Sequence, residues 1–170
     1  MSVAVYPGSF DPITNGHLDI VSRATAVFER LVIGVLANPR KTPLLAVDER
    51  IRIIAAAVEA AGGPAAAALG DGRIAITAFD GLTVDFCHAN GATAIVRGLR
   101  AISDFETEMQ LAHNNRVLAP DVDTVFFMTS LEHSYVSSSL VKEIALFGGD
   151  VSAMLPPPAV EALRDALPPR

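Results

Sequence analysis

The chain has 170 residues, of which 51% are hydrophobic and 19% charged, and its formal net charge at pH 7 is −6. This length fits one domain with a substantial core, and the apolar share excludes intrinsic disorder. The negative charge argues against general duplex nucleic-acid binding, which needs a clustered basic face, but it leaves room for a local basic site that binds a small phosphorylated substrate.

Several features lead us to expect a cytoplasmic protein. No apolar run approaches the ~20 residues that a membrane span requires. The N-terminal residues lack the charged region and apolar core of a signal peptide. Cys87 is the single cysteine, which rules out a disulfide framework and a cysteine-based zinc cluster. We interpret it as a small hydrophobic residue packed on a helix.

Short runs of branched apolar residues alternate with helical patterns along the chain. The runs predict strands buried on both faces at residues 3–6, 31–37, 73–78, 94–97 and 124–128. Apolar residues at helical spacing predict helices at residues 17–28, 47–61, 82–89 and 104–118. Because such alternation with right-handed crossovers gives a parallel sheet covered on both faces, we predict one α/β domain over residues 1–170. Its fold is a doubly wound, mostly parallel, five-stranded Rossmann-like sheet with a C-terminal helix.

Two segments lie outside this pattern. Residues 62–72 are small and have glycines at both ends, which predicts a flexible loop, inserted between a helix and a strand and free of chemistry. The tail, residues 155–170, has proline runs around the amphipathic stretch of Val160, Leu163 and Leu167. We predict that this stretch is a terminal helix lying on the domain.

The most informative motif is the turn YPGSFDPITNGH at residues 6–17. A turn that runs into a helix presents unpaired backbone N–H groups to an anion. Gly8 allows close backbone approach, Ser9 adds a hydroxyl, Asn15 is the candidate N-cap and His17 is aimed at the anion. Because open α/β sheets bind ligands at the carboxyl ends of their strands, we interpret the turn as a phosphate site rather than a plain turn with a surface histidine.

Two cationic clusters follow later strands. In the segment 38–41 (NPRK) two adjacent cations could neutralise a phosphate, although a solvated basic loop explains them equally well. In the segment 97–100 (RGLR) a glycine separates two guanidiniums, and a tight turn after the strand would point both forks to one side. Planar arginine donors match phosphate oxygens, so we favour a bound anion there.

A serine cluster begins the next helical pattern, in the sequence SYVSSS at residues 134–139. One serine suffices to cap a helix, and the surplus hydroxyls could grip a polyphosphate. His133, just upstream, is interpreted as an exposed loop residue that lines the site at most.

The signatures of other nucleotide-binding and catalytic classes are missing from the sequence. It contains no GxxxxGK[ST] and no GxGxxG after a strand. We also find no catalytic carboxylate pair, no Ser–His–Asp set and no metal-ligand pattern. The site is therefore cationic and hydroxylic, which suits phosphoryl or nucleotidyl transfer, where a protein positions groups and stabilises spreading charge.

Together these motifs resemble one known family. The opening turn resembles the T/HxGH signature of the nucleotidyltransferase superfamily, present as Asn15-Gly16-His17 in a variant form, and SYVSSSLVKE (residues 134–143) resembles its C-terminal serine motif. With VRGLRAISDFETEMQLAHNNR (residues 96–116), the chain from Val3 to about Leu155 is similar to bacterial phosphopantetheine adenylyltransferases.

The resemblance implies adenylyl transfer from ATP to 4′-phosphopantetheine, giving dephospho-coenzyme A and pyrophosphate, in a homohexamer of coenzyme A biosynthesis. It implies Mg²⁺ held mainly by substrate phosphates and no metal ligand from the protein. The catalytic residues it implies are His17, Lys41 and Arg97. For phosphopantetheine it implies Ser9, Lys41, Thr83 and Arg97. For ATP it implies Ser9, Phe10, His17, Gly98, Leu99, Arg100, Glu108, His133, Ser134, Tyr135, Val136, Ser137, Ser138 and Ser139.

Three positions depart from the family pattern. Ser9 replaces a common threonine, Thr107 stands where an aromatic residue is common, and Ala46 replaces a capping threonine at a cost of about 1 kcal/mol to the second helix.

Two alternative functions stay open. One is a related nucleotidyltransferase that acts on nicotinamide mononucleotide or glycerol phosphate, against which the RGLR segment and the serine run argue. The other is a non-catalytic nucleotide-binding module, against which the presence of His17, Lys41 and Arg97 argues.

Overall fold

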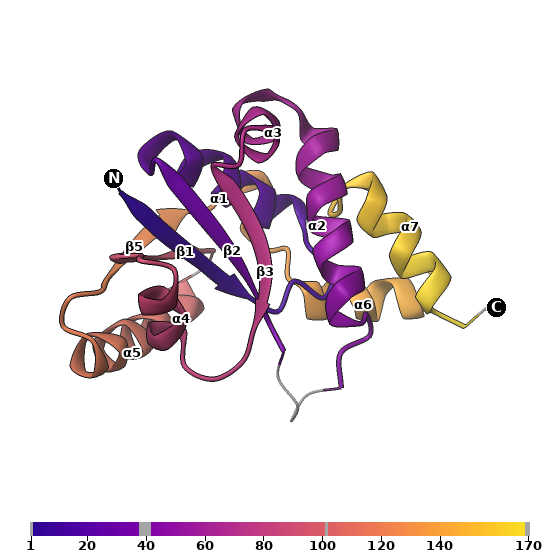
Figure 1. The fold of residues 1–170 in the computed structure, drawn as a ribbon. Helices are drawn as coiled ribbons and strands as arrows, with labels where there is room; N and C mark the ends of the chain where they lie inside the picture. Colours follow the sequence, from indigo (N-terminus) through magenta and orange to yellow (C-terminus); the bar gives the residue numbers. More distant parts are fainter. Residues whose placement is uncertain (1, 38–41, 101, 169–170) are drawn as a thin grey trace.

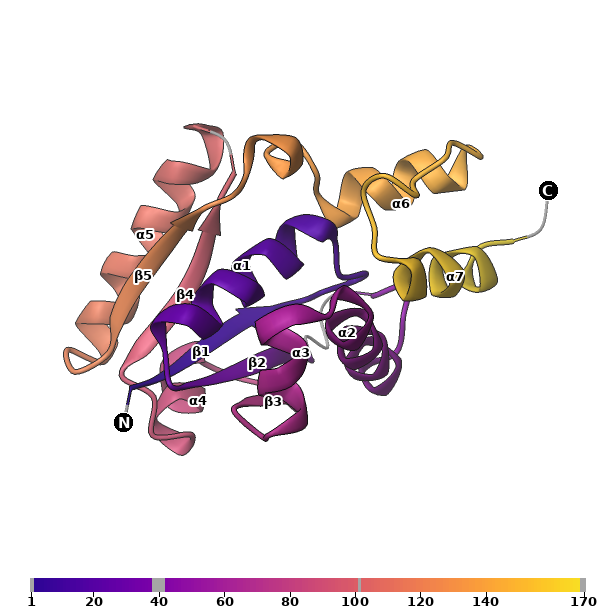
Figure 2. The same cartoon turned by 90° about the horizontal axis from the view of Figure 1, so that it is seen from above.

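The computed structural model describes residues 2–37, 42–100 and 102–168. Five strands form one sheet in the order β3-β2-β1-β4-β5, and each neighbouring pair is parallel (Figure 1; β4 is labelled in Figure 2). The strands are β1 (Val3–Gly8), β2 (Arg30–Leu36), β3 (Ile74–Phe79), β4 (Ala94–Leu99) and β5 (Asp123–Met128). The predicted doubly wound, Rossmann-like sheet is confirmed. Because β2 and β4 flank β1 on opposite sides, the switch point of the sheet lies between β1 and β4.

Helices cover both faces of the sheet. They are α1 (Asn15–Val27), α2 (Val47–Ala61), α3 (Gly63–Gly70), α4 (Thr83–Ala89), α5 (Ile102–Leu118), α6 (Ser138–Leu146) and α7 (Pro157–Ala166), with a short 3-10 helix, η1 (Leu131–His133). The four helices predicted before residue 120 correspond to α1, α2, α4 and α5, with small shifts at their ends. Both α6 and α7 lie at the end of the sheet to which β1 points (Figure 2).

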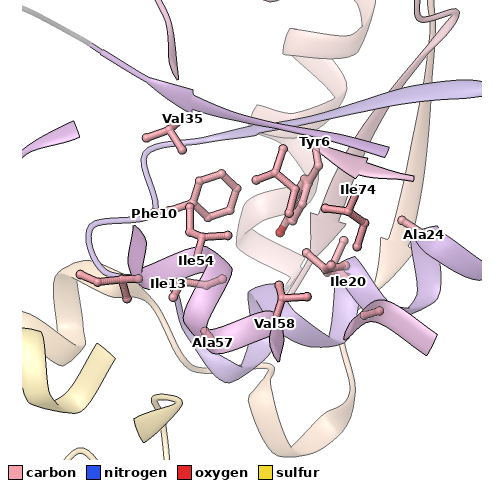
Figure 3. Packing of buried hydrophobic residues seen from close by; sticks show 14 of the residues in the cluster. Tyr6, Phe10, Ile13, Ile20, Ala24, Val35, Ile54, Ala57, Val58 and Ile74 are labelled. Carbon is pink, nitrogen blue, oxygen red and sulfur yellow. The ribbon is translucent and has the colours of Figure 1, made fainter. Parts of the chain in front are cut away.

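The alternation of side chains along β1 divides the core into two layers. Ala4 and Tyr6 pack under α1 and α2 against Ile20 and Ile54, in the larger layer shown in Figure 3. The intervening side chains, among them Val5, face the other way into a smaller layer with α4. Strands buried on both faces read as continuous apolar runs, which explains why the sequence pattern located them.

The segment 62–72 corrects the prediction of a flexible loop, because it contains the helix α3, with Ala65 and Ala68 buried against the domain. Alanine has the highest helix propensity, and Pro64 is favourable in the first turn, so a small-residue run can form a helix. The positive φ of 68° at Gly62 lets the chain turn from α2 into α3.

The remaining sequence predictions about packing are confirmed. The tail contains α7, whose Ala159 and Leu163 are buried against the domain. Cys87 is buried on α4, and burial raises the pKa of its thiol to about 11. Across the described ranges, no helix combines the length and apolar character needed to span a membrane.

Candidate active site

A cavity of about 270 Å³ lies at the carboxyl ends of β1 and β4. Its walls come from four places in the chain: the opening turn after β1 with the first turns of α1, the end of β4 with Glu108 of α5, Thr129 after β5, and the entry to α6. The predicted site residues that line it are Ser9, Phe10, His17, Arg97, Gly98, Arg100, Glu108, Val136, Ser137, Ser138 and Ser139. The fold therefore gathers three of the four polar clusters of the sequence into one site.

The opening turn forms an aromatic wall around His17. The Phe10 ring packs edge-on against Tyr6 at 5.3 Å and against His17 at 5.1 Å between ring centroids. Phe10 has a φ of 47°, a left-handed value that is rare for a bulky residue. A Cβ at Gly8 would lie 2.8 Å from the Phe10 ring. Only glycine leaves room for this packing, which holds the imidazole in place.

The N-cap of α1 is Thr14, which corrects the assignment of Asn15. Thr14 has the extended backbone of a cap, with φ −116° and ψ 167°, and its Oγ1 accepts from the backbone N–H of His17 at 3.3 Å. Asn15 is the first helical residue, and its amide donates to the carbonyl of Ala153 at 3.1 Å. Thr14 is also the first member of the T/HxGH signature, which therefore reads Thr14 to His17 and not Asn15 to His17.

The cap also fixes the protonation of His17. The backbone N–H of Thr14 donates to Nδ1 of His17 at 3.0 Å, so Nδ1 is an acceptor and the proton of the neutral ring sits on Nε2. Burial lowers the pKa of His17 to about 4, with further lowering by the charges of Arg100 and Arg97. At neutral pH the imidazole is therefore uncharged, and Nε2 is its single donor.

Arg97 is held by a forked ion pair. Its Nε and Nη2 each donate to a carboxylate oxygen of Glu108 at 2.6 Å, and its Nη1 donates to the carbonyl of Pro7 at 3.2 Å. Burial favours a lower pKa for Arg97, but Glu108 outweighs it and raises the value. Arg97 and Gly98 lie within β4, not in a turn after the strand as predicted. Glu108, expected to contact ATP, in this structure pairs with Arg97 across the cavity wall.

The serine run combines capping with contact between segments. Ser137 caps α6 by accepting from the backbone N–H of Leu140 at 3.2 Å, as predicted for a serine at a helix start. Ser138 donates through Oγ to the carbonyl of Pro12 at 2.8 Å. Arg100 donates through Nη1 to the carbonyl of Val136 at 3.0 Å. The second cationic cluster is therefore bonded to the segment that leads into α6.

Other predicted site residues lie outside the lining of this cavity. Leu99 is buried, Ser134 is buried and donates to the carbonyl of Ser130 at 2.9 Å, and Tyr135 is 84% exposed. His133 is partly buried in η1 rather than an exposed loop residue, because η1 packs it near Gly16.

Thr83 lines a separate cavity of about 60 Å³, which shares Pro7, Arg97 and Glu108 with the larger one. Lys41, with the rest of the segment 38–41, lies outside the described residues.

Sequence reasoning missed three charged residues that hold the site together, Asp11, Arg50 and Lys142. Arg50 on α2 is 2% exposed, and it donates to the carbonyls of Ser9, Leu36 and Leu45 at 2.6, 3.2 and 3.1 Å. A signal was present in the sequence: Arg50 precedes Ile53, Ile54 and Ala57 at helical spacing and so falls on the apolar face. A cation in that place is expected to be buried with partners.

The donor set of the cavity offers little to a metal ion. Within the described ranges, no three His, Cys, Asp or Glu side chains cluster closely enough to hold one. The carboxylate that lines the cavity, Glu108, is already bonded to Arg97.

Comparison with known proteins gives first the class and then the family. Residues 5–144 match the sequence model of the cytidylyltransferase-like family, which places the chain among nucleotidyltransferases. A phosphopantetheine adenylyltransferase from Lachnoclostridium phytofermentans is 48% identical over 97% of this chain and 95% of its own length. Another, from Heliobacterium modesticaldum, is 51% identical over 92% of this chain and 88% of its own length. The chain belongs to the phosphopantetheine adenylyltransferase family.

A solved structure agrees with the fold. The structure of a putative nicotinate-nucleotide adenylyltransferase from Vibrio parahaemolyticus matches 97% of this chain and 93% of its own, with a TM-score of 0.65. At 14% sequence identity it shows a shared fold alone.

Proposed function

We propose that this chain transfers the adenylyl group of ATP to 4′-phosphopantetheine and forms dephospho-coenzyme A and pyrophosphate, a step of coenzyme A biosynthesis. The observation that carries the proposal is one cavity that joins a neutral, oriented His17 to Arg97, Arg100 and the first turn of α6. Relatives of nearly full length that are named phosphopantetheine adenylyltransferases support this acceptor.

The reaction needs no general base. The phosphate monoester of the acceptor is largely dianionic near neutral pH, since its second pKa is about 6. One of its oxygens forms a bond to the α-phosphorus of ATP, while the bond between that phosphorus and the bridging oxygen to the β-phosphate breaks. Both electrons of that bond leave with pyrophosphate, and no proton has to be removed from the nucleophile. A site of cations and hydroxyls, without a catalytic carboxylate, suits this chemistry.

His17 stabilises the charge that develops on the transferred group. Its Nε2–H donates to a non-bridging oxygen of the α-phosphate, on which charge builds up as the new bond forms and the old one breaks. A neutral imidazole is suited to this task, because Thr14 occupies Nδ1 and fixes the ring, which leaves the Nε2–H to donate to the phosphate.

The cations reduce the repulsion between two polyanions. We assign the phosphate of the acceptor to Ser9, Lys41 and Arg97, and its pantetheine arm to the small cavity at Thr83. The small cavity supports this assignment, because it shares the side chain of Arg97 with the larger cavity. We assign ATP to Arg100, Gly98, Leu99, Phe10, Glu108 and residues 133–139, with Glu108 acting at least partly through its pair with Arg97.

We further propose that Mg²⁺ binds to the phosphates of ATP and reaches the site as part of that complex. This ion binds oxygen ligands, retains several waters and is commonly held by substrate phosphates. The side chains around the cavity fit that arrangement, because they are mostly cationic or hydroxylic and Glu108 is engaged by Arg97. The ion would add positive charge near the transferred phosphate, and the chain would supply the orienting donors.

We propose that the enzyme is cytoplasmic and that six copies of the chain assemble into a homohexamer. Light scattering coupled to size-exclusion chromatography would measure the mass directly, and a particle smaller than six chains at micromolar concentration would contradict this assembly.

One assay tests the function. Pyrophosphate release from ATP should depend on 4′-phosphopantetheine and be absent with nicotinamide mononucleotide or glycerol phosphate. Release with one of these other acceptors would instead assign a related transferase. No release with any acceptor, over a range of Mg²⁺ concentrations and with ATP binding intact, would indicate a non-catalytic nucleotide-binding module.

A further inference from the structure

Two walls of the active-site cavity, the opening loop and the first turn of α6, are joined by polar contacts. The opening loop supplies Ser9 and His17, and the first turn of α6 supplies Ser138 and Ser139. α6 has nine residues, and Val141 is its fully buried residue. A short helix with so small a buried face needs polar contacts to hold its position relative to the loop.

Two bonds tie α6 directly to the opening loop. One is the hydrogen bond from Ser138 Oγ to the carbonyl of Pro12 at 2.8 Å. The other is an ion pair one helical turn further on, in which Nζ of Lys142 donates to Oδ2 of Asp11 at 2.6 Å. Residues three or four apart lie on the same face of a helix, so both bonds hold one face of α6.

The side chain of Asp11 is held in place by several hydrogen bonds. Its side chain is 7% exposed, and its carboxylate also accepts from the backbone N–H groups of Leu44 and Leu45 at 3.0 and 2.9 Å. Burial favours a raised pKa, but Lys142 and the two N–H groups outweigh it and lower the pKa of Asp11. The carboxylate is therefore ionised at neutral pH and fixed on three sides.

Lys142 also borders the ligand space. A third cavity, of about 160 Å³, is lined by Lys142, Asp11 and Arg50, and it shares Ser9, Ser138 and Ser139 with the largest of those described above. The Lys142 side chain is 30% exposed. An ammonium in this place could act either through Asp11 or directly on a phosphate.

We propose that the Asp11–Lys142 ion pair fixes the first turn of α6 against the opening loop, so that Lys142 is a positioning residue for the phosphate chain of the nucleotide. The inference rests on the proposed function for its ligand, ATP. The geometry favours positioning over direct contact, because an ammonium that left Asp11 for a phosphate would leave a buried carboxylate without its cation.

A double-mutant cycle on ATP binding separates the two roles. Isothermal titration calorimetry would measure the affinity for ATP in the wild type, Lys142→Met, Asp11→Asn and the double variant. We expect each single change to weaken binding roughly tenfold, the scale on which members of one ion-pair network are coupled. Because the pair acts as a unit, the double variant should bind about as weakly as Asp11→Asn alone. Adenosine, which has no phosphates, should bind the wild type and Lys142→Met equally.

The controls lie on the same helix. Glu143→Gln changes the charge of an exposed neighbour outside the pair and should leave the affinity for ATP unchanged, and Lys142→Arg should restore most of it. Thermal unfolding of every variant would exclude loss of the fold. If Lys142→Met does not fold, Lys142→Gln enters the cycle in its place.

Three results would overturn the inference. Losses that multiply in the double variant would make Lys142 a direct phosphate contact, and an unchanged affinity in Lys142→Met would remove its role altogether, both with the proposed function intact. A wild type that does not bind ATP would instead refute the proposed function, and the inference with it.

Discussion

Two hydrogen bonds between backbone and side chain join Thr14 and His17 at the start of α1, and Oγ1 of Thr14 also lies 3.1 Å from Nδ1 of His17. The backbone N–H of Thr14 donates to Nδ1 of His17 at 3.0 Å, and Oγ1 of Thr14 accepts from the backbone N–H of His17 at 3.3 Å. A histidine in place of the usual acidic residue completes this capping box. The bond from the Thr14 N–H to Nδ1, which is part of this cap, therefore places the proton of the imidazole on Nε2.

Replacing His17 by alanine should separate catalysis from binding. We expect His17→Ala to lower kcat by roughly two to three orders of magnitude, because it removes a preorganised donor to the transferred phosphate. The affinity for ATP should change little, since the ground state keeps its cationic contacts. Steady-state kinetics and ATP titration measure the two quantities. An equal collapse of ATP affinity would make His17 a binding group instead.

Acidification should destabilise the fold through His17. Its pKa is about 4 in the folded chain and about 6.5 in an unfolded one. The unfolded state takes up the proton at a higher pH than the folded state does. The contribution of neutral His17 to the free energy of unfolding is therefore fully present above pH 6.5 and is lost as the pH falls towards 4. By pH 5 the loss is at most about 2 kcal/mol.

The check is urea unfolding between pH 7 and pH 5. His17→Asn should lack this part of the pH dependence, and the other histidines are common to both proteins. Identical pH profiles for the two would contradict the lowered pKa.

Arg97 should not tolerate lysine. A lysine presents one ammonium where Arg97 gives a fork to both carboxylate oxygens of Glu108. We expect Arg97→Lys to lower kcat/KM for phosphopantetheine roughly 10- to 100-fold, because the two cations are not interchangeable at a bidentate site. Arg116→Lys is the matched control, since its pair with Asp123 is exposed on both sides. Equal kinetics for both variants would argue against a role for the fork.

Arg50 should contribute to stability more than any exposed arginine. Arg50→Met removes the donors to three backbone carbonyls at the base of the site. We expect the free energy of unfolding to fall by about 2–4 kcal/mol, because buried carbonyls lose their partners. Arg52→Met, two residues along and exposed, should stay within about 0.5 kcal/mol of the wild type. Chemical denaturation measures both values, and similar losses would refute the structural role of Arg50.

The uncapped start of α2 should be improvable. Ala46 has the extended backbone of an N-cap, with φ −60° and ψ 155°, but makes no side-chain cap bond. Ala46→Ser should therefore raise the free energy of unfolding by about 1 kcal/mol. The same change at the exposed, mid-helix Ala56 should lower it by about 0.5 kcal/mol, because serine is a weaker helix former than alanine. A loss at both positions would show that residue 46 is not a cap.

Most of the secondary structure could be predicted from local patterns of the sequence. Strands such as β1 and β2 are buried on both faces, so they appear as continuous apolar runs. α3 was missed because its run of glycine, proline and alanine has no apolar period, although propensity alone favours a helix there. The cap of α1 was placed one residue late, since both Thr14 and Asn15 are good caps and only backbone geometry distinguishes them.

The sequence by itself determined the cationic and hydroxylic character of the site, because motifs of glycine, hydroxyl, histidine and arginine at the ends of strands predict anion binding without further information. Only the tertiary structure decided how those groups are used. It paired Arg97 with Glu108, joined Lys142 to Asp11 across 131 positions of the chain, and buried Arg50 beneath the opening turn. Such pairings depend on distances across the fold, and short-range spacing along a chain carries no record of them.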